Sequence, residues 1–175
     1  LVSQCGIFEY EGRFIMITDA AINIAPDVET QIGIVENALP VARALGVECP
    51  KVAVLSAVEN VTDKMPSTVT AREIAERGVE GCVISGPLAL DGAISMESVK
   101  HKAIKDPVAG QADILLVPFI EIGNVLYKAC SYIAGKTMAS TICGASCPVI
   151  ITSRADTPDS KYYSILMAVL RCLKA

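Results

Sequence analysis

The sequence predicts an α/β fold, an α/β/α sandwich in which helices cover both faces of a mostly parallel sheet. Hydrophobic residues make up 52% of the 175 residues, whereas aromatic residues make up only 5% and tryptophan is absent. An aliphatic core of this kind suits layered helix–sheet packing better than an aromatic-rich β-sandwich. Short, nearly continuous apolar runs alternate with helical patterns, as expected for parallel strands buried on both faces.

The first predicted elements are a β-hairpin and a long helix. Strands over 5–10 and 13–18 flank an acidic residue and a glycine at 11–12, which suit a tight turn. From Asp27 onward, apolar residues recur at helical spacing along one face, and Gly46 is a natural end for this helix.

Beyond residue 50, strands and helices alternate. We expect strands over 52–56, 82–85, 113–119 and 148–152, and helices over 67–77, 96–105, 124–134 and 159–173. Thr70 and Glu73 have the spacing of a capping box, and Asn124 is a suitable N-cap. Crossovers between parallel strands are right-handed by default, and ligands bind outside the carboxyl ends of such strands. The loops that follow the strands are therefore where a functional site is expected.

Composition argues against several classes of protein. The net charge is −4, from 15 basic and 19 acidic residues, and no basic stripe is available for nucleic acid. No apolar run approaches the roughly 20 residues needed to span a bilayer. Seven scattered cysteines indicate reduced thiols in the cytoplasm. A single histidine, His101, argues against a metal site.

The sequence also lacks three common catalytic or nucleotide-binding motifs. These are the phosphate-binding loop, the glycine-rich dinucleotide site and the nucleophile elbow.

Two segments after predicted strands contain glycine and polar residues. Residues 86–91 follow the strand over 82–85, and an ordinary strand-to-helix turn is the alternative explanation for them. Gly123 and Asn124 open a helix, with Lys128 one turn further on. Glycine lets the backbone approach a ligand, and a helix N-terminus can receive an anion. A plain helix start explains this second segment equally well.

The densest polar cluster follows the predicted strand over 148–152. It contains Ser153, Arg154, Asp156 and Asp159, just before the last helix. An arginine can hold a phosphate through two hydrogen bonds, and the helix start adds N–H donors. The alternative is a solvated loop in which a threonine or aspartate caps the helix.

Together these three segments resemble the phosphate acetyl/butyryltransferase family. Residues 85–95 look like its D-G-P-L motif followed by D-x-A-[IV], with Ser85 where the motif begins with Asp. Residues 108–128 are similar to its V-A-G-x-A-D and G-N-x-x-Y-K stretches. Residues 152–156 look closer to its butyryl branch than to its acetyl branch.

The resemblance implies a two-domain α/β/α architecture like that of isocitrate and isopropylmalate dehydrogenases, in a cytoplasmic homodimer. Residues 1–139 would form most of the second domain, and residues 140–175 would supply a strand and helix that complete the first. Because the chain begins at Leu1 rather than Met, we expect a truncated form that most of the first domain precedes. Such a fragment should have weak activity or none.

The activity implied is exchange of a short acyl group, butyryl or acetyl, between coenzyme A and inorganic phosphate, with acyl-CoA and acyl phosphate as the other reactants. Coenzyme A is then a substrate, and no cofactor, metal, nucleic acid or membrane partner is expected. By resemblance, Arg154 holds phosphate, Ser153 bonds near the reacting centre, and Asp156 or Asp159 assists deprotonation of the thiol. The substrate-binding residues are Gly86, Pro87, Asp91, Gly123, Asn124 and Lys128.

Proton transfer from the thiol places a physical limit on this mechanism. A carboxylate of pKa about 4 facing a thiol of pKa about 8.5 is short by roughly 4.5 units, or about 6 kcal/mol. Burial of the carboxylate, or a cation such as Arg154 beside the thiol, must reduce this gap. One alternative is a non-catalytic fragment that mainly dimerises. Another is a dehydrogenase on the same fold, which the absence of clustered aspartates for a metal argues against.

Overall fold

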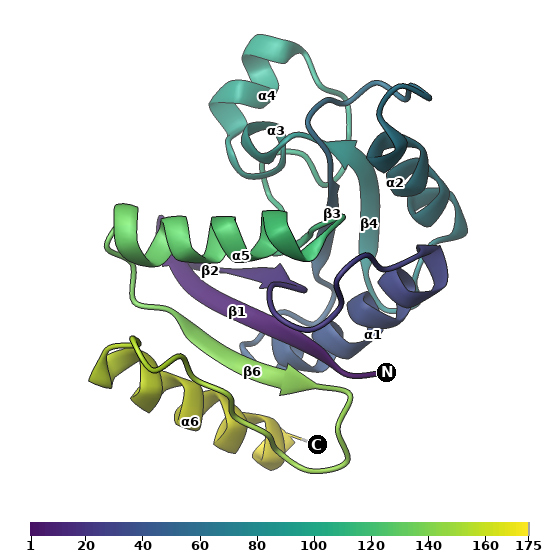
Figure 1. The fold of residues 1–175 in the computed structure, drawn as a ribbon. Coiled ribbons are helices and arrows are strands. Elements are labelled where there is room, and N and C mark those ends of the chain that lie inside the picture. Colours follow the sequence, from purple (N-terminus) through teal and green to yellow (C-terminus); the bar gives the residue numbers. More distant parts are fainter. Residues whose placement is uncertain (175) are drawn as a thin grey trace.

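The computed structural model describes residues 1–174, and a six-stranded sheet runs through the middle of these residues (Figure 1). The strands are β1 (Ser3–Tyr10), β2 (Arg13–Thr18), β3 (Lys51–Leu55), β4 (Val83–Leu88), β5 (Ile114–Leu116) and β6 (Ala139–Cys143). The helices are α1 (Val28–Ala44), α2 (Pro66–Arg77), α3 (Leu90–Ile94), α4 (Met96–Lys102), α5 (Ile120–Lys128) and α6 (Pro158–Lys174). A π-helical turn, η1 (Ala129–Ile133), continues α5.

The sheet is mixed and mostly parallel, with the strand order β4-β3-β5-β2-β1-β6. β2, β5, β3 and β4 pair in parallel, whereas β1 is antiparallel to both β2 and β6. Among the strands in residues 1–174, only β1 therefore runs against the others. The α/β class and the mostly parallel sheet predicted from the sequence are confirmed, and β4 and β6 form the two edges.

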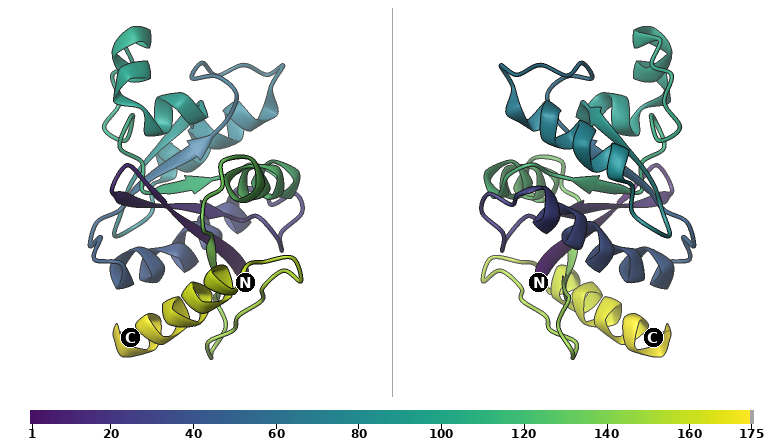
Figure 2. Two further views of the ribbon diagram at one scale, coloured as in Figure 1. Left: turned by 90° about the vertical axis from the view of Figure 1, so that its left-hand side faces the viewer. Right: turned by 90° about the vertical axis from the view of Figure 1, so that its right-hand side faces the viewer.

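Alternation along each strand sorts the core into two layers. Val52 and Ile114 point to one face of the sheet and pack with α1, α2 and α6. Ala53 and Leu115, the next residues along, point to the other face and pack with α3, α4 and α5. Figure 2 shows α1 and α6 along one side of the sheet and α5 along the other. Helices thus cover both faces, as the apolar strands predicted.

The last strand differs from the prediction. Residues 148–152 form an irregular loop with one isolated bridge, Ile142 to Val149, so the strand predicted there is wrong. The sixth strand is β6, which is less apolar in sequence but pairs along its length with β1. Helix α6 also binds this edge strand, because the Ser164 hydroxyl accepts a hydrogen bond from the Ser140 N–H at 2.9 Å.

Two helix starts also differ from the prediction. α2 begins at Pro66, whose ring presets the backbone of a first helical position, so the capping box predicted for Thr70 and Glu73 is wrong. α5 begins at Ile120, so Asn124 lies within the helix rather than at its N-cap. No helix within residues 1–174 combines the length and apolar character that crossing a membrane requires.

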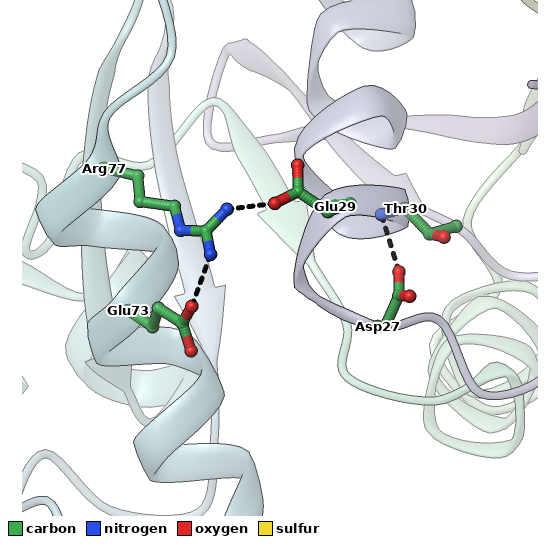
Figure 3. Close-up of polar contacts among 5 residues, drawn as sticks. All are labelled: Asp27, Glu29, Thr30, Glu73 and Arg77. Carbon is green, nitrogen blue, oxygen red and sulfur yellow. Dashed lines mark hydrogen bonds and ion pairs between the residues drawn. The ribbon is translucent and has the colours of Figure 1, made fainter.

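Charged side chains connect α1 with α2 on the surface (Figure 3). Asp27 caps α1 by accepting a hydrogen bond from the Thr30 N–H at 2.9 Å, which confirms the predicted start of that helix. Arg77 on α2 forms ion pairs with Glu73 at 2.7 Å and with Glu29 of α1. Because exposed ion pairs are weak, the apolar core fixes the positions of these helices and the ion pairs refine them.

Candidate functional site

A pocket of about 320 Å³ lies on the α5 side of the sheet, between this helix and the loop before α6. Gln4 of β1 and Ser140 and Ile142 of β6 line it from the sheet. The surrounding walls come from α5, η1 and two loops, and contain Ala20, Ala21, Ile22, Asn124, Tyr127, Lys128, Tyr132, Ile151, Thr152, Ser153 and Asp156. The pocket therefore combines apolar walls with amide, hydroxyl, ammonium and carboxylate groups.

Four of the residues predicted for the site line this pocket. Asn124 and Lys128 reach it from α5, and Ser153 and Asp156 reach it from the loop before α6. Asp159, the other candidate carboxylate, lies exposed in the first turn of α6 and does not line the pocket. Two segments that are far apart in the sequence are thus brought together, although the second follows an irregular loop rather than the strand predicted over 148–152.

A tight turn holds the loop residues in place. The Asp156 carboxylate accepts a hydrogen bond from the Ser153 N–H at 2.6 Å, and the Asp156 N–H donates to the Ser153 carbonyl at 3.1 Å. The Ser153 hydroxyl accepts from the Ala155 N–H at 3.3 Å. Arg154 lies exposed at the tip of this turn and forms no hydrogen bond or ion pair with another residue in 1–174. Arg154 does not line the pocket, but it adjoins Ser153, which does, and its exposed guanidinium is available to an anion.

Close backbone contact fixes α5 against the end of β2. Gly123 is buried, and a Cβ at this position would lie 2.6 Å from the Asp19 carbonyl oxygen and 2.9 Å from the Ala20 Cα. The Asn124 amide donates to the Ala20 carbonyl at 3.3 Å. The family resemblance implied that Gly123 and Asn124 bind substrate. In the structure, both residues contact the backbone after β2 and so position α5, the helix that carries Lys128.

Asp19 is a residue that sequence reasoning missed. It follows β2 directly and is only 2% exposed. Its carboxylate accepts hydrogen bonds from the Ala21 N–H at 2.9 Å, the Ile22 N–H at 3.1 Å and the Asn23 side-chain amide at 2.6 Å. These contacts fix the backbone of residues 20–22, which form one wall of the pocket. An aspartate at the carboxyl end of a buried strand was the signal that could have identified it.

Tyr127 is a second residue that the predicted site did not include. Its ring packs against β1, where a Cβ on Gly6 would lie 2.6 Å from the Tyr127 Cδ2. Burial, aided by the nearby Asp156 carboxylate, raises the pKa of Tyr127 to about 12. The phenol therefore stays protonated at neutral pH and can donate a hydrogen bond within the pocket.

Gln4 is the third missed residue, and its side chain is buried at the sheet side of the pocket. It is 6% exposed, and its Oε1 has no hydrogen-bond partner among residues 1–174. Its neighbour Ser140 donates a hydrogen bond to the Ile151 carbonyl at 3.3 Å, which joins β6 to the pocket loop. Because β1 also contains Ser3 and Glu9, no sequence signal singled out Gln4.

The first predicted segment lies at the opposite edge of the sheet, in and after β4. Gly86 and Pro87 are buried within this strand, and a Cβ on Gly86 would lie 2.8 Å from the Val54 Cβ. Asp91 accepts a hydrogen bond from Lys102 at 2.9 Å, which holds the pKa of its carboxyl below the usual value. The structure does not bring this segment to the pocket.

The charges around the pocket suit an organic anion better than a metal ion. Lys128 and Arg154 supply positive charge near Asp156, and the apolar walls can receive a short hydrocarbon chain. Within residues 1–174, no group of three or more His, Cys, Asp or Glu side chains could hold a metal. The arrangement can bind a phosphate-like anion beside a carbonyl compound and offer hydroxyl donors to it.

Comparison with known proteins gives a consistent family. The sequence model of a family described as "Phosphate acetyl/butaryl transferase" matches residues 1–169. A "Probable phosphate butyryltransferase" of Bacillus subtilis is 48% identical over 175 residues, which cover 97% of this chain and 58% of the relative. The chain thus spans well under two thirds of the length of the curated relatives it matches.

Solved structures extend this comparison. The crystal structure of a branched-chain phosphotransacylase from Enterococcus faecalis superposes with a TM-score of 0.92 at 42% identity, covering 98% of this chain and 63% of the other. A putative 4-hydroxythreonine-4-phosphate dehydrogenase from Salmonella typhimurium superposes with a TM-score of 0.55 at 15% identity, over 97% of this chain and 54% of the other. At that identity the likeness concerns the fold alone.

Proposed function

This chain belongs to the phosphate acetyl/butaryl transferase family, and we propose that it forms part of an enzyme that transfers a short acyl group between coenzyme A and inorganic phosphate. The acyl group is butyryl or acetyl, and acyl phosphate is the other product. The observation that carries the proposal is the pocket in which Asn124, Lys128, Ser153 and Asp156 converge. Its apolar walls suit a short acyl chain, and its cationic rim suits phosphate.

Arg154 and Ser153 are the proposed phosphate and carbonyl contacts. Arg154 is exposed beside the pocket without a partner in residues 1–174, and a guanidinium can hold phosphate through two hydrogen bonds. Ser153 lines the pocket next to it and would hydrogen-bond near the reacting carbonyl. Lys128 adds a second positive charge on the facing wall. Stabilisation of the developing oxyanion then comes from fixed donors around one small space.

The proposed reaction is attack of the coenzyme thiolate on the carbonyl of the acyl phosphate. The S–C bond forms, the C–O bond to phosphate breaks, and the thiol proton goes to a nearby carboxylate. Asp156 lines the pocket with Ser153 whereas Asp159 does not, which supports Asp156 as that carboxylate. Positive charge from Arg154 and Lys128 would lower the pKa of the thiol and reduce the cost of the transfer.

The remaining predicted residues have supporting roles in this proposal. Gly123 and Asn124 hold α5 against the end of β2. Their proposed role in substrate binding is therefore indirect, because they position the wall of the pocket that α5 forms. Gly86, Pro87 and Asp91 lie near the opposite edge of the sheet, where we propose that they meet parts of coenzyme A outside the pocket. Coenzyme A is a substrate in this scheme, and the scheme includes no cofactor.

We also propose the two-domain architecture of isocitrate and isopropylmalate dehydrogenases for the whole enzyme. Residues 1–139 would belong to its second domain and residues 140–175 would complete its first. The 0.55 TM-score with a dehydrogenase fold supports this relationship. Exposed apolar side chains on α6, such as Ile165 and Val169, would contact the rest of the first domain. A cytoplasmic location follows from the metabolic substrates proposed.

A second candidate function is a dimerisation module without catalysis of its own. Ile122 and Val125 on α5 and Ile133 at its end are 46%, 68% and 86% exposed, a pattern that suits a helix-to-helix contact between two copies. The proposed homodimer would use this face in either case. The two functions are distinguished by adding a chain that supplies the rest of the enzyme. Restored activity would favour the acyltransferase, whereas a folded dimer without activity would favour the dimerisation module.

The proposed function is tested by following thiol release from butyryl-CoA and phosphate in the full-length protein that contains this chain. Arg154→Ala should lower kcat/KM at least about 100-fold, which corresponds to roughly 2.7 kcal/mol of transition-state binding. Arg72→Ala, at an exposed arginine on α2 away from the pocket, is the matched control and should retain activity. Absence of turnover with any short acyl-CoA in folded protein would contradict the proposal.

A further inference from the structure

An isoleucine in the segment after β2 presents an apolar side chain to the pocket. Ile22 lines the pocket and is 36% exposed, and it belongs to neither of the two core layers. Its side chain therefore has surface available to a ligand. Because single apolar residues are common on protein surfaces, exposure alone would indicate nothing. The way in which its backbone is held distinguishes Ile22 from such residues.

The buried Asp19 carboxylate fixes the backbone on both sides of Ile22. It accepts hydrogen bonds from the Ala21 N–H at 2.9 Å, the Ile22 N–H at 3.1 Å and the Asn23 N–H at 3.1 Å. The Asn23 side-chain amide donates to the same carboxylate at 2.6 Å and to the Val2 carbonyl at 2.9 Å. Hydrogen bonds to a charged acceptor are stronger than neutral ones, so this wall keeps its shape. A fixed wall can discriminate between ligands of different length.

The walls of the pocket differ in polarity. α5 and η1 supply polar side chains, namely Asn124, Tyr127, Lys128 and Tyr132. The loop before α6 supplies the Ser153 hydroxyl and the Asp156 carboxylate. The wall after β2 consists of Ala20, Ala21 and Ile22, which carry no polar side-chain atom. Because the two alanines are small, Ile22 is the side chain that determines how far this wall extends into the pocket.

An acyl chain whose carbonyl lies beside Ser153 has one apolar wall to extend along. The wall that contains Lys128 is polar, and desolvating an ammonium group with a hydrocarbon chain is unfavourable. Ile142 lines the pocket but is only 4% exposed. Ile151 is on the same loop as Ser153, so a chain that extends away from this loop leaves Ile151 behind. The wall that contains Ile22 remains.

We propose that Ile22 is a specificity-determining residue that contacts the last carbon atoms of a butyryl group. The inference rests on the proposed function and names a determinant of its acyl-chain preference. An acetyl group ends two carbon atoms earlier, so it does not gain this contact. Burial of each further methylene group against Ile22 then favours the longer chain.

Ile24 provides a matched control on the same segment. It is 69% exposed and does not line the pocket. Its carbonyl accepts a hydrogen bond from the Ile120 N–H at 3.0 Å, which a change of side chain leaves in place. Ile24→Ala and Ile22→Ala therefore remove the same atoms from one short segment. Because neither side chain belongs to a core layer, both variants should fold as the wild-type protein does.

The test compares acetyl-CoA, propionyl-CoA and butyryl-CoA as donors to phosphate with the full-length protein. All three contain the same coenzyme, so contacts to the coenzyme cancel in the ratio of kcat/KM values. In Ile22→Ala, the ratio for butyryl-CoA to acetyl-CoA should fall about fourfold, the equivalent of one buried methylene group. The ratio for propionyl-CoA to acetyl-CoA should fall less. In Ile24→Ala, both ratios should keep their wild-type values.

Three results would overturn the inference. The first is a wild-type ratio in Ile22→Ala, and the second is an equal loss of activity toward all three donors, which would mean that Ile22 contacts the shared coenzyme. The third is a ratio lowered by Ile151→Ala and not by Ile22→Ala, because the chain would then lie along the loop before α6. A wild-type protein that transfers no acyl group from any of the three donors to phosphate would refute the proposed function itself, and this inference with it.

Discussion

The two edges of the sheet carry similar sequence signals and use them differently. At the β4 edge, polar side chains find partners within the chain: Ser85 donates to Asp106, and Asp91 pairs with Lys102. Near the β6 edge, Gln4 of the neighbouring strand β1 keeps an unpartnered buried oxygen, and the residue lines a pocket. Glycine and polar residues after a strand therefore do not by themselves indicate a site. The partners of the polar groups distinguish packing from binding.

The largest effect expected is that of Gly123→Ala. The added Cβ would lie 2.6 Å from the Asp19 carbonyl oxygen and 2.9 Å from the Ala20 Cα, both backbone atoms with little freedom to move. We expect a free energy of unfolding lower by about 3 kcal/mol, at the upper end of overpacking costs. Urea denaturation followed by circular dichroism measures this, and kcat should also fall because α5 carries a wall of the pocket.

Gly86→Ala makes the equivalent change at the other edge and is the control for Gly123→Ala. Its Cβ would lie 2.8 Å from the Val54 Cβ and 3.0 Å from the Val54 carbonyl oxygen. A loss of about 2 kcal/mol in stability is expected from overpacking, with kcat of the folded protein retained. If Gly86→Ala reduced kcat as much as Gly123→Ala does, the distinction between the two edges would fail.

Much of the fold could be predicted because its signals are local. The hairpin over β1 and β2 follows from two apolar runs around a glycine turn, and α1 from helical spacing after Asp27. The sixth strand could not be predicted, because residues 139–143 are less apolar than 148–152. Pairing with β1 and the hydrogen bond from Ser140 to Ser164 decide between the two segments, and neither contact is visible in the local sequence.

The candidate site was predicted only in part for the same reason. Ser153 and Asp156 lie in an evident polar cluster, and the structure gathers them with Asn124 and Lys128 in one pocket. Gln4 was missed because its importance depends on which face of β1 it occupies and on which neighbours lack donors. Those properties come from strand pairing and helix packing, which a single sequence pattern does not contain.

A pH experiment sharpens the description of the β6 edge. Burial and the Asp156 carboxylate raise the pKa of Tyr127 to about 12, above its ordinary value near 10. The unfolded chain therefore loses this proton first, and the stability linked to the protonated phenol is complete below pH 10 and is lost as pH rises toward 12. Relative to Tyr127→Phe, wild-type stability in urea should fall over this interval.

The same titration distinguishes the two candidate carboxylates. Asp156→Asn removes the nearby negative charge and should lower the pKa of Tyr127, although burial, the larger cause, keeps it above the ordinary value. Asp159→Asn, in the first turn of α6, should leave the titration unchanged. Ultraviolet absorbance of the tyrosinate measures each case. Equal shifts in the two variants would contradict the assignment of Asp156 to the pocket.

The smallest effect is expected from Asp91→Asn at the β4 edge. The carboxyl is half exposed and accepts a hydrogen bond from Lys102, which lowers its pKa, so its small stabilisation is present at neutral pH and is lost as pH falls through that lowered pKa. Because exposed ion pairs contribute little, the free energy of unfolding should change by less than about 1 kcal/mol. The proposed contact of Asp91 with coenzyme A predicts that KM for butyryl-CoA rises about threefold, the value of a weak exposed contact, while KM for phosphate stays unchanged. Unchanged KM values for both substrates would contradict that contact and leave this edge a role in packing alone.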